Sequence, residues 1–351
     1  MSFRKIVGRT VAVAVLAALG LAGCSSTTPA APSSDSTGGG SATQPAASST
    51  TAGSGTASGS GQPAADADPQ CGKQTRTIKH EFGETTISGK PSRVVVLEFS
   101  FADALGAIGI SPVGVADDGD SSRLIPQVRQ EIGDYTSVGN RQSPSLQNIA
   151  ALRPDLIIAD SSRHKAIYDQ LSKMAPTIAL PANRATIAMN LDAARTIGVA
   201  VDECQKMTVR LQQNKSRLEA AAAKLPKDLP PVLFAVGSDK ALTVHNLAGY
   251  VPSLLAELGL KYLLPADPAN PQAEESEETL ATQNPGVMFV ASSKKAPTIF
   301  DSWAKDPVGS SIAAVKDGKV FRVSADTWSR AKGITASEVV ADEVVALLTG
   351  K

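Results

Sequence analysis

The chain has 351 residues with 34 basic and 34 acidic side chains, but only three histidines and 4% aromatic residues. This balance excludes the strongly basic surface of nucleic-acid-binding proteins, and so few histidines offer little for zinc or haem ligation by side chains. The chain also lacks a Walker A loop, a G-x-S-x-G motif and a G-x-G-x-x-G motif after its first strand. We therefore predict that it is not an enzyme.

The amino terminus has the features of an export signal. Arg4, Lys5 and Arg9 form a positive segment, and an apolar run too short to span a bilayer as a helix follows them. The run closes with L-A-G-C at Cys24, which resembles the lipobox of bacterial lipoproteins, where the signal peptidase cuts before the cysteine that carries the lipid. We predict a lipoprotein signal peptide over residues 1–23 and an anchor to the outer face of the cytoplasmic membrane.

Residues 24–70 consist largely of Ser, Thr, Ala, Gly and Pro, with almost no large apolar residue. Such a composition cannot bury enough surface to offset chain entropy, so we predict a disordered tether between the lipid and the folded part. Because three basic residues leave with the signal, the mature chain carries 31 basic and 34 acidic side chains. This slight negative charge argues against a nucleic-acid partner.

Two cysteines, Cys71 and Cys204, remain in the mature chain. An exported compartment permits a disulfide, and a bonded pair would leave no odd thiol. The sequence cannot show whether the two lie within bridging distance. A disulfide and two free thiols both stay open.

Residues 71–185 alternate short apolar strands, such as VVVLE, VGVA and LIIAD, with amphipathic segments, such as FADALGAIG and SLQNIAAL. This alternation is typical of βα units on a parallel sheet. Residues 186–229 repeat apolar side chains at three- and four-residue steps and predict a helical linker. Within it, Asp202-Glu203 indicates a break and a new helix start.

Residues 230–351 contain strand candidates VLFAVGS, ALTVH, VMFVASS and VFRVS, with helix candidates VPSLLAELGL, EETLATQ, SSIAAVKDG and SEVVADEVVALLT. The periodicity alone therefore predicts an α/β protein of two lobes. It does not predict where a ligand would bind.

Several motifs resemble the ferric dicitrate-binding proteins of iron-uptake ABC transporters. They are ADSSRH around Arg163, VGNR at Arg141, SSRLIPQVR at Arg123 and DTWSRAKG in the second lobe. The resemblance covers roughly residues 78–350. It implies the siderophore-binding helical-backbone class (class III) of substrate-binding proteins, in which each lobe has a mostly parallel sheet flanked by helices, a long backbone helix joins the lobes, and the ligand lies between them.

A ferric citrate chelate is anionic, and the planar donor fork of arginine matches its carboxylates. The resemblance implies that the iron arrives inside its chelator, with no direct metal ligand and no cofactor from the protein. The residues it implies for ligand binding are Arg123, Arg141, Arg163, Tyr250, Trp328 and Arg330. Glu98, just after the run VVVL, is a further candidate as a hydrogen-bond acceptor on the floor of the pocket. Core positions for Trp328 and Tyr250, and a structural pairing of Glu98 with an arginine, remain open alternatives.

The chain departs from the family pattern at three places. Asn183 stands where relatives carry an arginine, with Arg184 one place later. Relatives have a glutamate on each lobe that meets the permease. Glu278 matches the glutamate of the second lobe, but Gln147 replaces that of the first and cannot form the ion pair.

The sequence thus predicts a monomeric, lipid-anchored substrate-binding protein that captures a ferric siderophore and delivers it to an ABC permease. Ferric citrate is the leading ligand, and another anionic siderophore such as a citrate-hydroxamate is the runner-up. Cobalamin and haem fit less well because the candidate site is rich in arginine and poor in aromatic residues. A non-transport envelope lipoprotein and an esterase-like enzyme on the same scaffold are the alternatives from other classes.

Overall fold

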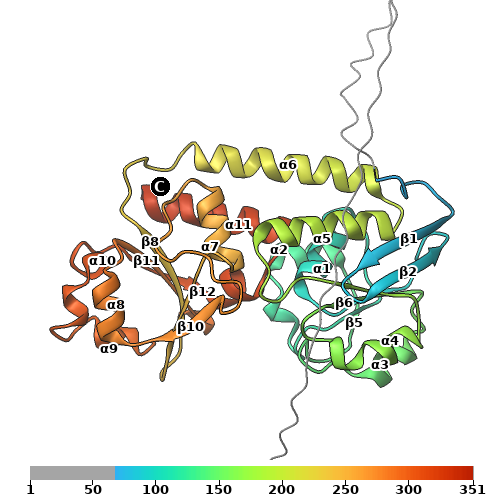
Figure 1. Cartoon of the computed structure of the whole chain (residues 1–351), viewed down its shortest axis with the longest axis horizontal. Coiled ribbons are helices and arrows are strands. Elements are labelled where there is room, and N and C mark those ends of the chain that lie inside the picture. Colours follow the sequence, from blue (N-terminus) through green and yellow to red (C-terminus); the bar gives the residue numbers. More distant parts are fainter. Residues whose placement is uncertain (1–67, 351) are drawn as a thin grey trace, which may run out of the picture. The chain divides into compact units, whose positions relative to one another are not determined.

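The computed structural model describes residues 68–350 (Figure 1). The predicted signal peptide, the predicted lipidation site at Cys24 and nearly all of the predicted tether lie outside these residues. Among the described residues, no helix combines the length and the apolar character needed to cross a membrane.

A parallel sheet with the strand order β5-β4-β3-β6-β7 forms the first lobe. The central strands β3 and β6 are buried throughout, because helices cover both faces of the sheet and the strands are continuous apolar runs. An antiparallel hairpin of β1 and β2 precedes the sheet. The bounds are β1 Thr75–His80, β2 Gly83–Ser88, β3 Val94–Val96, β4 Gly114–Val115, β5 Thr136–Ser137, β6 Leu156–Asp160 and β7 Thr177–Leu180.

The helices of the first lobe are short and follow the strands. Two of them show why they begin where they do: Pro126 occupies the first turn of α2, and the Ser145 hydroxyl accepts a hydrogen bond from the Asn148 amide at the start of α3. The bounds are α1 Phe99–Gly106, α2 Pro126–Ile132, α3 Leu146–Ala151 and α4 Tyr168–Ser172.

The linker consists of two helices, α5 (Ile187–Ala200) and α6 (Cys204–Ala222). The break predicted at Asp202-Glu203 is present, and Asp202 has the positive φ of 58° that ends α5. Gly198 lets the two helices meet closely, since a Cβ there would lie 2.5 Å from Cβ of Met207.

The second lobe has a mixed sheet with the order β10-β9-β8-β11-β12, in which β8, β11 and β12 are parallel. Strand β10 was not predicted, because its sequence QAEE is polar. It lies on the edge of the sheet, where exposed charged side chains are common. The strands are β8 Val232–Gly237, β9 Leu242–His245, β10 Gln272–Glu275, β11 Val287–Ser292 and β12 Val320–Ser324. The helices are α7 Tyr250–Glu257, α8 Glu277–Gln283, α9 Phe300–Trp303, α10 Ala313–Lys316 and α11 Ile334–Thr349.

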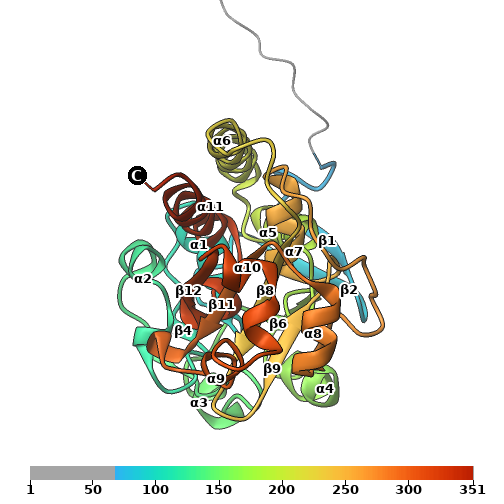
Figure 2. The same ribbon diagram turned by 90° about the vertical axis from the view of Figure 1, so that its left-hand side faces the viewer.

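Helix α11 belongs to the second lobe by sequence, but its first turn packs into the first. It contacts α6 and α1, and both views show these helices near one another (Figures 1 and 2). Ala331, Ile334 and Ala336 are part of the core that also contains α1 and α5. The lobes therefore share buried apolar surface at the start of α11.

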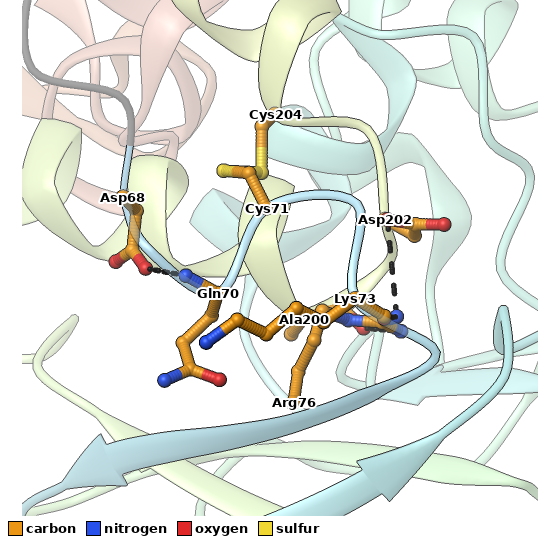
Figure 3. The surroundings of a disulfide bond; sticks show 8 residues. All are labelled: Asp68, Gln70, Cys71, Lys73, Arg76, Ala200, Asp202 and Cys204. Atoms are coloured by element: carbon orange, nitrogen blue, oxygen red, sulfur yellow. Dashed lines mark hydrogen bonds and ion pairs between the residues drawn. A yellow bond between two sulfur atoms is a disulfide. The ribbon is translucent and has the colours of Figure 1, made fainter.

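Cys71 and Cys204 form a disulfide with their Cα atoms 6.0 Å apart (Figure 3). Beside it the fully buried Arg76 donates to the carbonyl oxygens of Lys73 at 2.7 Å and Ala200 at 3.2 Å. The first alternative left open by the sequence is thus the one observed. The bond joins the beginning of the described part of the chain to the beginning of α6, 133 residues later.

Candidate ligand-binding site

Three of the charged side chains singled out in the first lobe, together with Asp118, which the sequence analysis did not name, lie just after parallel strands. Glu98 follows β3, Asp118 follows β4, Arg141 follows β5 and Arg163 follows β6. These strands are neighbours in the sheet and run in the same direction, so their carboxyl ends share one edge. The fold therefore gathers residues that are up to 65 positions apart in the sequence.

Glu98 is the centre of this group, with only 3% of its surface exposed. Its Oε1 pairs with Nη1 of Arg163, and its Oε2 lies 3.4 Å from Nη1 of Arg141. Two guanidinium groups thus share one buried carboxylate. A buried charge is tolerated when it is paired and hydrogen-bonded in this way.

Asp118 holds Arg141 from the other side. Its Oδ1 accepts the Arg141 backbone amide at 3.0 Å, and its Oδ2 lies 2.8 Å from Arg141 Nη2 and 3.4 Å from Nη1 of the more exposed Arg123. Burial opposes the charged form of Asp118, but the hydrogen bonds from Arg141 outweigh it and lower the pKa of Asp118. Burial likewise disfavours charged Arg141, and the bonds to Asp118 and the charge of Glu98 outweigh it and raise the pKa of Arg141.

The guanidinium of Arg141 also lies over the ring of Phe99, with 3.9 Å between its central carbon and the ring centre. This cation–π contact adds to the ion pairs and fixes the plane of the guanidinium. Arg163 is held by a bond from Nη2 to Oδ1 of Asn183 at 3.1 Å. Its buried Nε has no hydrogen-bond partner among residues 68–350.

Asp160, which the sequence analysis did not single out, fixes the backbone around this group. Its Oδ1 accepts the amides of Ser162 at 3.0 Å and Arg163 at 2.7 Å, and its Oδ2 accepts those of Ala182 and Asn183. The signal was present in the motif ADSSRH, because an aspartate at a strand end followed by two serines is typical of an Asx turn.

His164 connects the same turn to Arg141. Its Nδ1 accepts the Asp160 amide at 2.8 Å, so Nε2 carries the proton and donates to the Arg141 carbonyl oxygen at 2.8 Å. Burial lowers the pKa of His164, which favours this neutral form. His164 therefore supports the site through the backbone.

Lys332 is the contribution of the second lobe, and the sequence analysis missed it. Its Nζ donates to the Ala182 carbonyl oxygen at 3.2 Å. Burial lowers the pKa of Lys332 to about 8, with Glu98 raising it and Arg163 lowering it. Lysine inside a loop carries no signal of its own, and only the fold shows that this amine meets the first lobe.

We call this group the strand-end cluster. It has more cations than carboxylates, and the Asp160 oxygens are already engaged by backbone amides. Its members are Glu98, Asp118, Arg123, Arg141, Asp160, Arg163 and Lys332.

The other residues predicted in the second lobe lie elsewhere. Trp328 is fully buried between Phe234 and Phe289, and its Nε1 donates to Glu343 at 2.6 Å. Tyr250 is 4% exposed. Both occupy the core, which is the alternative that the sequence left open for them, because large aromatic side chains fill the volume between a sheet and its helices.

Arg330 lies in the π-helical turn Asp326–Arg330 and pairs with Asp326 at 2.8 Å. Its side chain is 27% exposed and has no bond to the strand-end cluster within the described residues. Arg184 is exposed and has a positive φ of 56°.

Glu278 is exposed in the first turn of α8, and Gln147 is exposed on α3. Two hollows on the described surface, of about 470 Å³ along α6 and about 240 Å³ beside β1 and β7, include no residue of the strand-end cluster. No group of three or more His, Cys, Asp or Glu side chains within residues 68–350 is placed to hold a metal ion.

Comparison with known proteins identifies the relatives of the chain. The sequence profile of a family described as periplasmic binding protein matches residues 94–327. The Fe(3+)-citrate-binding protein YfmC of Bacillus subtilis is 39% identical over 280 residues, which are 80% of this chain and 88% of that protein. The Fe(3+) dicitrate-binding periplasmic protein FecB of Escherichia coli is 39% identical over 271 residues, 77% of this chain and 89% of that protein. These relatives confirm the resemblance inferred from the motifs.

Among solved structures, that of Staphylococcus aureus SirA complexed with staphyloferrin B is similar with a TM-score of 0.68. It is 24% identical and covers 78% of this chain and 98% of that one. At this identity the likeness concerns the fold, and it confirms the predicted fold class of an α/β protein with mostly parallel sheets flanked by helices.

Proposed function

Because the chain belongs to the periplasmic binding protein family, we propose that it is the substrate-binding protein of an ABC importer and that its ligand is a ferric siderophore, with ferric citrate as the foremost candidate. The protein binds and releases this chelate without catalysing a reaction. The strand-end cluster is the ligand-binding site. The relatives named for ferric citrate and ferric dicitrate support this ligand class.

The single observation that carries the proposal is the shared carboxylate of Glu98. Arg141 and Arg163 both use Glu98 as a partner, and Arg163 still has a buried Nε without one among the described residues. A carboxylate on the ligand matches the geometry of these donors and can replace or extend the protein's own carboxylate. Lys332 supplies a further cation from the second lobe.

The number of charge-assisted contacts sets the affinity that this site can reach. A hydrogen bond to a charged group contributes about 1.5–3 kcal/mol, and a micromolar Kd corresponds to about 8 kcal/mol. Five such contacts amount to about 7.5–15 kcal/mol before the cost of association, so sub-micromolar binding requires contacts near the upper end of that range. Arg123 is the most exposed of the three arginines and contributes least in this account.

Delivery to the permease uses Glu278 of α8, whose exposed side chain is free to meet a basic partner. The first lobe presents the uncharged Gln147 instead, so the docking charge is unequal between the lobes. The chain acts as a monomer held at the outer face of the cytoplasmic membrane by a lipid on Cys24.

The test is a titration of the purified protein with ferric citrate, followed by calorimetry, with iron-free citrate and a ferric hydroxamate as controls. We expect saturable binding of ferric citrate that is lost in Arg163→Ala and retained in Arg184→Ala, a matched variant of an exposed arginine nearby. If the protein binds another ferric chelate but not ferric citrate, it is still a siderophore-binding protein, with a different ligand. Silence with every chelate would refute the proposed function and direct attention to the scaffold and esterase alternatives.

A further inference from the structure

Asp103 of α1 makes an unusual connection between the lobes. It is 1% exposed, and its carboxylate caps the first turn of α11, which belongs to the second lobe. Oδ1 accepts the amides of Ile334 and Thr335, and Oδ2 accepts the amide of Ala336, each at 2.9 Å. Three of the amides that every helix leaves unpaired at its start thus receive their partner from the other lobe.

Gly333, the residue before α11, makes this close contact possible. Its φ is 120°, and a Cβ on it would lie 2.8 Å from Cγ of Asp103. On its other side the Tyr250 hydroxyl accepts the Gly333 amide at 3.0 Å and donates to the Gly333 carbonyl oxygen at 2.8 Å. The backbone at this position is therefore held between α1 and α7.

The next residue toward the amino terminus is Lys332, whose amine donates to the Ala182 carbonyl oxygen beside the strand-end cluster. The fixed backbone places the Cα of Lys332, and from that point its side chain extends to the first lobe. The cap on α11 and the position of the Lys332 amine thus both depend on the backbone conformation at Gly333.

We propose that Asp103 is a positioning residue for ligand binding: by capping α11 across the lobe boundary, it holds the Lys332 amine in the strand-end cluster. Asp103 does not touch the ligand in this account. Through Asp103, the position of the Lys332 charge depends on the contact between the two lobes.

The groups that face Asp103 bear on its charge. Glu131 of α2, which accepts from the Thr335 hydroxyl, favours protonation of Asp103, and Arg210 of α6 opposes it. Tyr250 of α7 stays a neutral hydroxyl, because burial and the charge of Asp103 both raise its pKa. Glu338 of α11 acts on Glu131 in turn, raising the pKa of that carboxyl.

Burial is the largest influence on Asp103 and raises its pKa to about 7, against the lowering effect of the backbone amides. Only the carboxylate accepts all three amides with both oxygens. The cap is therefore complete above about pH 7 and weakens as the pH falls through that value. The expected consequence is a loss of ligand affinity on mild acidification.

The first experiment needs no ligand. Lysine amines of the purified protein are labelled by reductive ¹³C-dimethylation, and the Lys332 signal, assigned with Lys332→Arg, is titrated by NMR. In Asp103→Asn we expect the pKa of Lys332 to rise from about 8 toward its ordinary 10.5, because the amine leaves its partly buried position for solvent. Removal of the negative charge of Asp103 alone would have the opposite sign. An unchanged or lower pKa of Lys332 would overturn the proposal.

Two further variants keep this experiment decisive if Asp103→Asn does not fold. Tyr250→Phe removes only the hydroxyl that brackets Gly333, and we expect a smaller rise of the same sign. Glu338→Gln is the matched control: it removes a buried carboxylate one turn along α11 whose partners lie on α6, and it should leave the pKa of Lys332 unchanged. A flat result in Tyr250→Phe, or an equal rise in Glu338→Gln, would count against Asp103 as the specific support.

The second experiment concerns affinity and rests on the proposed function. With ferric citrate as the probe, Asp103→Asn should weaken binding by roughly tenfold in the native background and not at all in the Lys332→Ala background. The affinity of Asp103→Asn for ferric citrate should also be independent of pH around 7. The pH dependence of the chelate itself is measured with Lys332→Ala and is subtracted first. An equal loss in both backgrounds would show a merely structural role. If the native protein binds no ferric chelate, the proposed function fails, and the lysine titration still decides the role of Asp103.

Discussion

The strand-end cluster and the lobe boundary both bury carboxylates, but they use them differently. Glu98 in the cluster is paired with side-chain cations that are 11–19% exposed, and the partners of Asp103 at the boundary are backbone amides that are buried. A side-chain ion pair can exchange one carboxylate for another when a ligand arrives. A helix cap cannot exchange its partner without moving the helix, so the boundary is suited to hold a position and the cluster to change partners.

Arg141→Ala is expected to have the largest effect, because it reduces both the stability of the protein and its affinity for the ligand. It leaves Glu98 and Asp118 buried with fewer partners, which should lower the free energy of unfolding by about 3 kcal/mol. It should also weaken ferric citrate binding by more than about 100-fold, since two or more charge-assisted bonds are lost. Urea unfolding and calorimetry measure the two effects.

Arg330→Ala provides the contrast for Arg141→Ala. Arg330 pairs only with Asp326 in its own turn among the described residues, and both side chains are partly exposed. Exposed pairs of this kind contribute less than about 1 kcal/mol. A loss of affinity as large as that of Arg141→Ala would show that the second-lobe turn moves into the site when the ligand binds, and the cluster would then need to be extended.

Removal of the disulfide should affect stability and spare the ligand. The bond between Cys71 and Cys204 closes a loop of 133 residues, so Cys71→Ser with Cys204→Ser is expected to cost about 4 kcal/mol of unfolding free energy. The affinity for ferric citrate should stay within about twofold of the native value, since neither cysteine lies in the cluster. A loss of affinity without a loss of stability would contradict this assignment.

Glu338→Gln tests whether stability and ligand affinity can be separated at the lobe boundary. Glu338 is 4% exposed and accepts from Arg210 at 2.6 Å, Arg217 at 2.6 Å and Asn214 at 3.0 Å. Breaking this network should lower the free energy of unfolding by about 3 kcal/mol. Ligand affinity should be unchanged, because Asp103 of α1 still caps the first turn of α11. Weaker binding in this variant would mean that any destabilisation of α11 disturbs the strand-end cluster. Asp103 would then not be the specific positioning residue.

The sequence was most informative where chemistry is local. The apolar runs VVV and LIIAD predicted the buried strands β3 and β6, and the family motifs predicted the three arginines of the cluster. The motif around Arg163 even contained the Asx turn of Asp160, although this was not recognised. What the sequence could not show depends on contacts across the lobes. Lys332 and Asp103 are an unremarkable lysine and helix aspartate until the chain places them against the other lobe.

The core position of the second-lobe residue Trp328 illustrates the same limit. The motif DTWSRAKG placed Trp328 beside Arg330 in a loop after a strand, where a ligand-facing side chain is plausible. In the structure Trp328 is fully buried against Phe234 and Phe289, and its only bond within the described residues goes to Glu343. Trp328→Phe keeps an aromatic ring and loses that bond and some packing volume, which should cost about 1–2 kcal/mol of unfolding free energy. Ferric citrate affinity measured by calorimetry should be unchanged, and a tenfold loss would return this side chain to the binding site.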